Sequence, residues 1–169
     1  MEISKAKMEP KEKILLLAKA MQNGEIPIQG LVEFYGQAKD PEKGFCLSAI
    51  TSITKDNPGF IKDPLDFIIS QINYKAPRVK WEACEIIANA SKKFPQQVVG
   101  AIPRLLETTK DEGTVVRWSA ALGLTEIAKN NPQSRKELLP FIERMAESET
   151  QSGIKKIYIK ALKALLKEK

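Results

Sequence analysis

Residues 116–128 of this chain read VRWSAALGLTEIA, and residues 79–91 read VKWEACEIIANAS, so that Trp118 lies 37 positions after Trp81. The same shift superimposes several prolines on one another. These are Pro27 and Pro64, Pro103 and Pro140, and the three residues Pro58, Pro95 and Pro132. A fixed period of this length indicates a protein built from stacked structural repeats. Stacked repeats typically present an extended surface to a partner, so the period predicts the shape of the protein before any motif is considered.

Each repeat is predicted to be a pair of α-helices. In residues 79–95, small and apolar side chains recur at helical spacing, which indicates a face buried against neighbouring helices. Their positions are Val79, Ala83, Ile86, Ile87 and Ala90, and the next repeat has Val116, Ala120, Leu124, Ile127 and Ala128. Proline ends each of the first three such segments, because it lacks an amide proton and clashes with the preceding turn. The second helices are thus expected within residues 42–58, 79–95, 116–132 and 154–169, and the first helices within 27–39, 64–75, 101–110 and 138–147.

The repeats are expected to form one domain, residues 1–169, without an internal linker. Residues 1–24 contain a further amphipathic helix, which we predict to cover the N-terminal end of the stack, because the end units of a repeat array need a polar outer face. Four repeats follow at residues 25–60, 61–98, 99–135 and 136–169. The chain is therefore predicted to be an all-α, right-handed solenoid of stacked antiparallel helix pairs, with about nine helices.

The pattern of residues 116–128 resembles the second helix of a HEAT repeat, which opens on Val-Arg, continues with alanines and closes on Leu-x-x-Ile-Ala. Val79-Lys80 and Ile154-Lys155 reproduce this opening with lysine in place of arginine, whereas the first repeat has Glu42-Lys43. The resemblance extends over nearly the whole chain. It implies an armadillo-like solenoid whose second helices line the concave face. It leaves the function open, because HEAT proteins serve as scaffolds, adaptors, transport receptors and occasionally enzymes.

One column of the repeat is basic in all four copies and consists of Lys43, Lys80, Arg117 and Lys155. The HEAT resemblance implies a structural role, in which each side chain bonds to the loop or the aspartate of a neighbouring repeat. The alternative is a row of positive charge, with about 10 Å between stacked helices, that faces an acidic peptide or a polyanion. Further lysines, including Lys156 and Lys160, make the last helix strongly basic, although the helix dipole alone also favours lysines near a C-terminal end.

Trp81 and Trp118 follow the basic column directly and lie off the buried stripes of their helices. Equivalent positions in adjacent repeats are neighbours in space, so the two indoles are predicted to form one aromatic ridge. Tryptophan is enriched at binding hot spots and stacks well on bases or cations. The competing interpretation is that each indole packs sideways against the next repeat and is buried.

The composition does not favour an enzyme or a metal centre. The chain has no histidine, which removes the commonest general base and the commonest metal ligand. Cys46 and Cys84 are expected to be buried small hydrophobes, and acidic pairs such as Glu82 and Glu85 are expected on a solvated helix face. Neither a cofactor nor a metal is expected. Without an apolar run of about 20 residues, a secretory signal or a disulfide framework, the chain is expected in the cytoplasm.

The sequence predicts a non-enzymatic scaffold or adaptor that binds a peptide or protein on its concave face, and the net charge of +6 suits an acidic partner. The expected contact residues are Trp81, Trp118, Lys43, Lys80, Arg117, Lys155, Lys156 and Lys160. The alternative is nucleic-acid binding through the basic concave face, including a remote likeness to HEAT-like DNA glycosylases, which use tryptophans and an aspartate. No aspartate lies within a helical turn of either tryptophan. A monomer and a homodimer are both compatible with the sequence.

Overall fold

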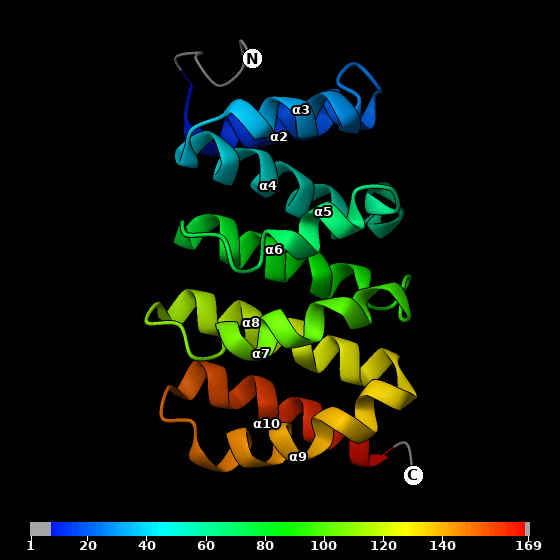
Figure 1. Cartoon of the computed structure of the whole chain (residues 1–169), viewed down its shortest axis with the longest axis vertical. Helices are drawn as coiled ribbons and strands as arrows, with labels where there is room; N and C mark the ends of the chain where they lie inside the picture. Colours follow the sequence, from blue (N-terminus) through cyan, green and yellow to red (C-terminus); the bar gives the residue numbers. More distant parts are fainter. Residues whose placement is uncertain (1–7, 168–169) are drawn as a thin grey trace.

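The computed structural model describes residues 8–167, and within that range the chain forms nine α-helices and two short 3₁₀ helices without any strand. The helices stack into an elongated rod, with the N-terminal and C-terminal parts of the chain at opposite ends (Figure 1). The predicted all-α solenoid of about nine helices is confirmed. Residues 1–7 of the predicted N-terminal cap and residues 168–169 of the last predicted repeat lie outside the described residues.

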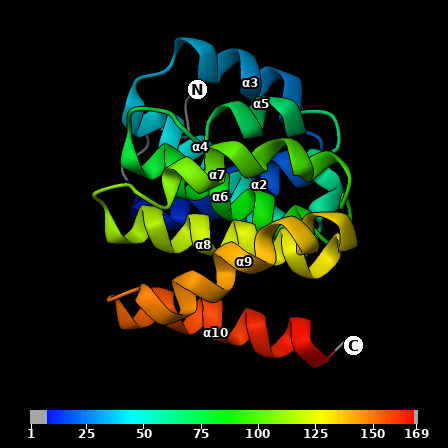
Figure 2. The same ribbon diagram turned by 60° about the horizontal axis from the view of Figure 1, so that its bottom comes forward.

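The helices form two layers. The second helices of the repeats stack directly on one another along the rod, and α2 (Pro10–Gln22) packs against the first of them. The second helices are α4 (Asp40–Thr54), α6 (Pro77–Ala90), α8 (Thr114–Asn130) and α10 (Ser152–Lys167). The first helices pack against this layer and follow one another along the rod, as Figure 2 shows. They are α3 (Ile28–Gln37), α5 (Leu65–Ser70), α7 (Ile102–Thr108) and α9 (Pro132–Ser148).

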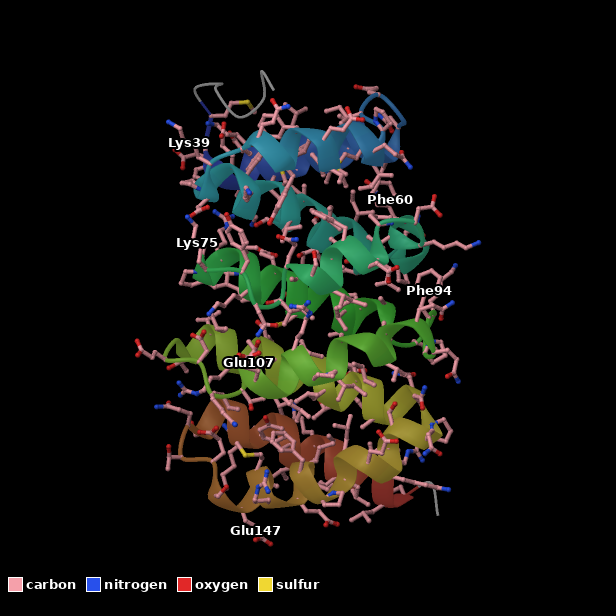
Figure 3. The ribbon with its side chains drawn as sticks, in the orientation of Figure 1. Lys39, Phe60, Lys75, Phe94, Glu107 and Glu147 are labelled. Carbon is pink, nitrogen blue, oxygen red and sulfur yellow. The ribbon has the colours of Figure 1, made fainter. Side chains whose placement is uncertain are left out.

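The connections between helices lie on two opposite edges of the rod. The connections within a repeat, between its first and second helix, lie on one edge, which is marked by Lys39 and Lys75 (Figure 3). The connections between successive repeats lie on the other edge, which is marked by Phe60 and Phe94. The 3₁₀ helices η1 (Pro58–Ile61) and η2 (Gln97–Ala101) belong to the second kind of connection. All second helices therefore run in the same direction across the rod.

The helix expected within residues 64–75 is shorter than predicted and ends at Ser70. The hydroxyl of Ser70 and the side-chain amide of Gln71 both donate to the backbone carbonyl of Phe67. These side chains occupy an acceptor that a continuing helix would use for its own backbone amide, and they thereby favour the end of the helix.

The helix expected within residues 138–147 is longer than predicted and begins at Pro132. The side chain of Asn131 caps it by accepting a hydrogen bond of 2.9 Å from the backbone amide of Ser134. Proline suits the first position of a helix, because its missing amide proton has no partner to lose there. Pro132 thus starts α9 as well as ending α8.

The predicted buried stripes form the core of the rod. Val79, Ala83, Ile86, Ile87 and Ala90 of α6 are fully buried, and their counterparts in α8 are at most 1% exposed. On the first helices, one column of equivalent residues fills the space between the layers and is at most 2% exposed: Leu31, Ile68, Leu105 and Ile142. Cys46 and Cys84 are free thiols in the same core. They act as small hydrophobes, as the sequence predicts.

Candidate binding surface

The second helices leave one face uncovered, and its side chains recur every three or four residues along each helix. We call this face the outer stripe. It consists of Arg78, Trp81, Glu85 and Asn89 on α6, Val115, Trp118, Leu122 and Glu126 on α8, and Lys156 and Lys160 on α10. All of these side chains are at least partly exposed, in contrast to Ala83 and Leu124 on the packed faces. Because α8 packs against both α6 and α10, the stripe continues across three helices.

Both predicted tryptophans belong to the outer stripe. Trp118 is 37% exposed and Trp81 is partly exposed, so neither indole is enclosed in the core. They hold equivalent positions on the adjacent helices α6 and α8. The equivalent residue on α4 is Gly44, where a Cβ atom would come within 2.7 Å of Cδ of Arg78. The aromatic pair is therefore bounded by Arg78 on one side and by Lys156 on the other.

Two residues of the predicted basic column bind the loop between α7 and α8. Nζ of Lys80 lies 2.5 Å from Oδ2 of Asp111, and a guanidinium nitrogen of Arg117 donates to the carbonyls of Asp111 (2.9 Å) and Glu112 (3.1 Å). Burial opposes ionisation of Asp111, but hydrogen bonds from Lys80 and from the Gly113 amide lower the pKa of this carboxyl overall. The loop is thus held from both neighbouring second helices.

The other two residues of the basic column, Lys43 and Lys155, also make intramolecular contacts. Nζ of Lys43 lies 4.9 Å from the ring centroid of Tyr35 and 5.0 Å from that of Tyr74, which is a cation–π arrangement. Nζ of Lys155 donates to the carbonyl of Glu147 at 2.8 Å. Of the four residues, only Lys80 bonds to the aspartate of a neighbouring repeat as the HEAT resemblance implies, whereas Arg117 and Lys155 bond to carbonyls of their own repeats. A role of these four residues in binding stays a prediction.

The prediction that Glu82 and Glu85 lie on a solvated face is wrong for Glu82, which is only 9% exposed. Its carboxylate accepts hydrogen bonds from the hydroxyls of Ser48 (2.5 Å) and Thr51 (2.6 Å) on α4, and Nε of Arg78 lies 4.0 Å away. These hydroxyls precede Glu82 by 34 and 31 positions, close to one repeat. Hydroxyl residues about one repeat before Glu82 are therefore the signal in the sequence that this carboxylate is buried and hydrogen-bonded, and a count of charges does not detect it.

Glu85 lies one turn further along α6, and its carboxylate is poorly paired. The hydroxyl of Ser119 donates to its Oε1 at 3.5 Å, which is the outer limit for a hydrogen bond. Burial and then the negative charge of Glu82 raise the pKa of Glu85, against smaller opposing effects of Lys55 and Ser119. Among residues 8–167, no lysine or arginine forms an ion pair with this carboxylate.

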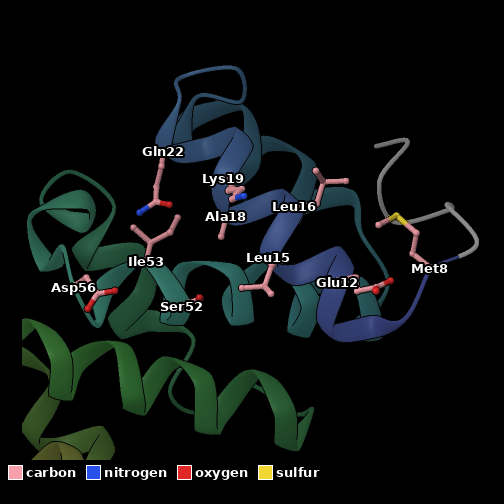
Figure 4. A pocket seen from close by; sticks show the side chains of 10 residues that line it. All are labelled: Met8, Glu12, Leu15, Leu16, Ala18, Lys19, Gln22, Ser52, Ile53 and Asp56. Atoms are coloured by element: carbon pink, nitrogen blue, oxygen red, sulfur yellow. The ribbon is translucent and has the colours of Figure 1, made fainter.

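Two shallow depressions adjoin α2. The larger, of about 580 Å³, lies between α2 and α4 near the N-terminal end of the rod (Figure 4), where Leu15 and Leu16 are exposed. The smaller, of about 270 Å³, lies where α2, α4 and α6 meet, and Arg78, Glu82 and Glu85 are among its lining residues. The smaller depression connects the outer stripe of α6 with the surface of α2.

Over the part of the chain that the structure describes, no group of three or more acidic, cysteine or histidine side chains is placed to hold a metal ion. No helix in that part combines the length and the apolar character that crossing a bilayer requires.

The arrangement of helices is similar to that of known repeat proteins. A designed armadillo repeat protein matches 91% of this chain with a TM-score of 0.71 and 22% identity, and 68% of that protein is covered. Another, in complex with the peptide (KR)4, matches 91% with a TM-score of 0.73 and 22% identity, again with 68% covered. A computationally designed armadillo repeat protein for modular peptide recognition gives a TM-score of 0.73 over 90% of the chain at 22% identity, with 68% of it covered. The chain therefore has the fold of a HEAT- or armadillo-type helical-repeat solenoid.

The sequence also has a natural relative over part of its length. A stretch of 108 residues, 64% of the chain, is 26% identical to the AP-3 complex subunit delta-1 of Bos taurus. The match spans 9% of that protein, so it concerns only a small part of it. No protein-family model matches the chain.

Proposed function

We propose that this chain is a non-enzymatic scaffold or adaptor that binds an extended peptide or protein segment across the outer stripe. The observation that carries the proposal is the exposure of Trp118 (37%) on a helix, with Trp81 at the equivalent position of the neighbouring helix. Tryptophan dominates binding hot spots because it offers a large rigid surface with few torsions to fix. A preformed stack of helices also avoids much of the ordering entropy that a flexible binder loses.

The layer of second helices is proposed to be the concave, partner-binding face of the solenoid. The designed armadillo repeat protein in complex with (KR)4 supports a peptide-binding role for this fold, as does the one designed for modular peptide recognition. The AP-3 subunit is by name a component of a protein complex, which supports a macromolecular partner. The cytoplasmic location and the oligomeric state stay predictions.

The proposed contact residues divide into two groups. Trp81, Trp118, Lys156 and Lys160 belong to the outer stripe and are assigned direct contact with the partner. Lys43 and Lys80 contact the following repeat, and Arg117 and Lys155 bond within their own repeats. All four are proposed to add positive potential next to the stripe. The acidic character predicted for the partner therefore rests mainly on the exposed lysines of α10.

Selection of peptides from a displayed random library against the immobilised chain tests this proposal. The selected peptides are expected to bind the native chain and to lose at least about tenfold in affinity for a Trp81→Ala, Trp118→Ala double variant. Leu166→Ala is the matched control, because Leu166 is a large apolar residue of α10 that is 51% exposed and lies outside the outer stripe. Circular dichroism checks that both variants stay helical. The proposal is wrong if no peptide is enriched, or if the folded double variant binds the selected peptides as tightly as the native chain.

A further inference from the structure

Exposed apolar side chains gather on the uncovered side of α2. Of the six large apolar side chains that are exposed within residues 8–167, three lie there: Met8, Leu15 and Leu16. All three line the depression of about 580 Å³ between α2 and α4 (Figure 4). Single exposed apolar side chains are ordinary on a protein surface, but a contiguous group beside a depression marks a site of association.

Two charged residues flank the leucines on the same side of the helix. Glu12, Leu15, Leu16 and Lys19 follow one another at helical spacing and all line the same depression, so they form one stripe of α2. We call these four residues, together with Met8, the α2 face. Both charged side chains are exposed, and within residues 8–167 neither of them forms an ion pair. Their charges are therefore available to a partner.

The α2 face is complementary to itself. If two α2 helices pack antiparallel with Leu15 of one copy opposite Leu16 of the other, Glu12 of each copy lies opposite Lys19 of the other. This follows because Glu12 precedes Leu15 by as many residues as Lys19 follows Leu16. Two ion pairs then flank the four leucines about a two-fold axis, as an isologous contact requires. A parallel pair in register would instead bring like charges together, which is unfavourable.

We propose that two copies of this chain associate through the α2 face, with their α2 helices antiparallel. A second copy is the occupant because the same helix supplies both the leucines and the opposite charges in the matching order. The same alignment places Lys11 opposite Ala20, so this further charge of α2 meets no like charge. The outer stripe lies on α6, α8 and α10, and the association is therefore separate from the proposed function.

The association is expected to be weak. The helix α2 has 13 residues, which corresponds to a length of about 20 Å. One pair of such helices is expected to bury less than the about 1,200 Å² that stable interfaces exceed. The two copies should therefore be in measurable equilibrium with the monomer.

Sedimentation equilibrium of the full chain, over micromolar to millimolar concentrations, tests the proposal. The average mass is expected to rise from 18.9 kDa toward twice that value and no further, because a two-fold contact closes on itself. Replacing both leucines, Leu15→Ala with Leu16→Ala, should weaken the association at least about tenfold, because it removes most of the apolar contact. Leu166→Ala is the matched control, since Leu166 is an exposed leucine of α10, and it should leave the association unchanged.

Charge reversal tests the antiparallel pairing. Glu12→Lys alone and Lys19→Glu alone each place like charges opposite one another twice, so each should weaken self-association at least about tenfold. The two variants are complementary to each other, and their equimolar mixture should associate about as tightly as the native chain. Glu143→Lys is the control for net charge, because it makes the same reversal at an exposed position of α9, and it should change the association less than about twofold. Circular dichroism checks that every variant stays helical.

A chain that stays monomeric over the whole range, or whose mass rises past that of a dimer, would overturn the inference. So would a dimer that the double leucine variant leaves unchanged, or a mixture of the two charge variants that does not associate. A dimer that is lost in the Trp81→Ala, Trp118→Ala variant would place the contact on the outer stripe and would overturn it as well. Peptide selection against the outer stripe is measured separately, so failure of this inference and failure of the proposed function are distinguishable.

Discussion

Replacing Asp111 with asparagine is expected to lower the free energy of unfolding by about 2 kcal/mol. The side chains of Lys80 and Asp111 are 23% and 16% exposed, so their ion pair is neither a surface pair nor a fully buried one. Surface pairs contribute about 0 to 1 kcal/mol, whereas removal of one partner of a buried pair costs about 3 to 5 kcal/mol. The variant leaves the ammonium of Lys80 without its counter-ion but keeps an oxygen for the Gly113 amide, which places the cost between the two ranges.

Urea unfolding followed by circular dichroism measures this change. With a slope of about 2 kcal/mol per molar urea, the transition midpoint should fall by about 1 M. Adding Lys80→Gln to the Asp111→Asn variant should cost little more, because the two residues act as one unit. A loss below about 0.5 kcal/mol for Asp111→Asn would refute the reasoning, since Lys80 would then have no structural role and its charge would be available to a partner.

The same pair predicts how stability responds to acid. The pKa of Asp111 is lowered in the folded protein, so the folded state binds fewer protons at this group than the unfolded state does. Its contribution is therefore complete above the unfolded pKa of about 3.9 and is lost as the pH falls through the lower folded pKa. The stability difference between the native chain and Asp111→Asn should narrow below about pH 4. A difference that stays constant down to acid pH would contradict this assignment.

Three further predictions concern the core, the thiols and the partner. Ser48→Ala should lower the free energy of unfolding by about 1 to 3 kcal/mol, because the buried carboxylate of Glu82 loses a hydrogen-bond donor. Urea unfolding measures this loss, and the control is Ser52→Ala, which changes a partly exposed serine of the same helix. Cys46 and Cys84 should react with a thiol reagent only after unfolding, because burial encloses both and raises the pKa of Cys46 to about 12; fast reaction of the native chain would contradict the packed core. The affinity of a selected peptide should fall less than about tenfold between about 50 and 200 mM salt. A nucleic acid held through about 6 to 10 phosphate contacts would instead lose a factor of about 10³ to 10⁵ in affinity over the same range. A DNA or RNA duplex that binds more tightly than the peptide, with that steep salt dependence, would favour the nucleic-acid alternative.

The repeat and its packing are predictable from the sequence because they depend on residues that recur. Val79 and Val116 open equivalent buried stripes, and the stripes can be extended along the chain by the period alone. Helix ends depend on local bonds that the period does not carry. The early end of α5 follows from the hydroxyl of Ser70, and the early start of α9 follows from the cap at Asn131.

The candidate surface is predictable only in part. The 37-residue spacing places Trp81 and Trp118 on adjacent helices, but their exposure depends on how the second helices are rotated against one another, which no single residue determines. Likewise, Glu82 and Glu85 are only three residues apart and have the same charge. They differ because Ser48 and Thr51 of the preceding helix reach one carboxylate and not the other. A contact between repeats of this kind becomes visible only in three dimensions.

The central claim is that the outer stripe binds a partner through its tryptophans, and calorimetric titration of one library-selected peptide tests it most directly. Trp118→Ala should lose at least about 2 kcal/mol of binding free energy, or about 30-fold in affinity, while the Leu166→Ala control binds as the native chain does. Because Trp118 is 37% exposed, the variant should keep its helical content. Unchanged affinity in a folded Trp118→Ala variant would contradict the claim.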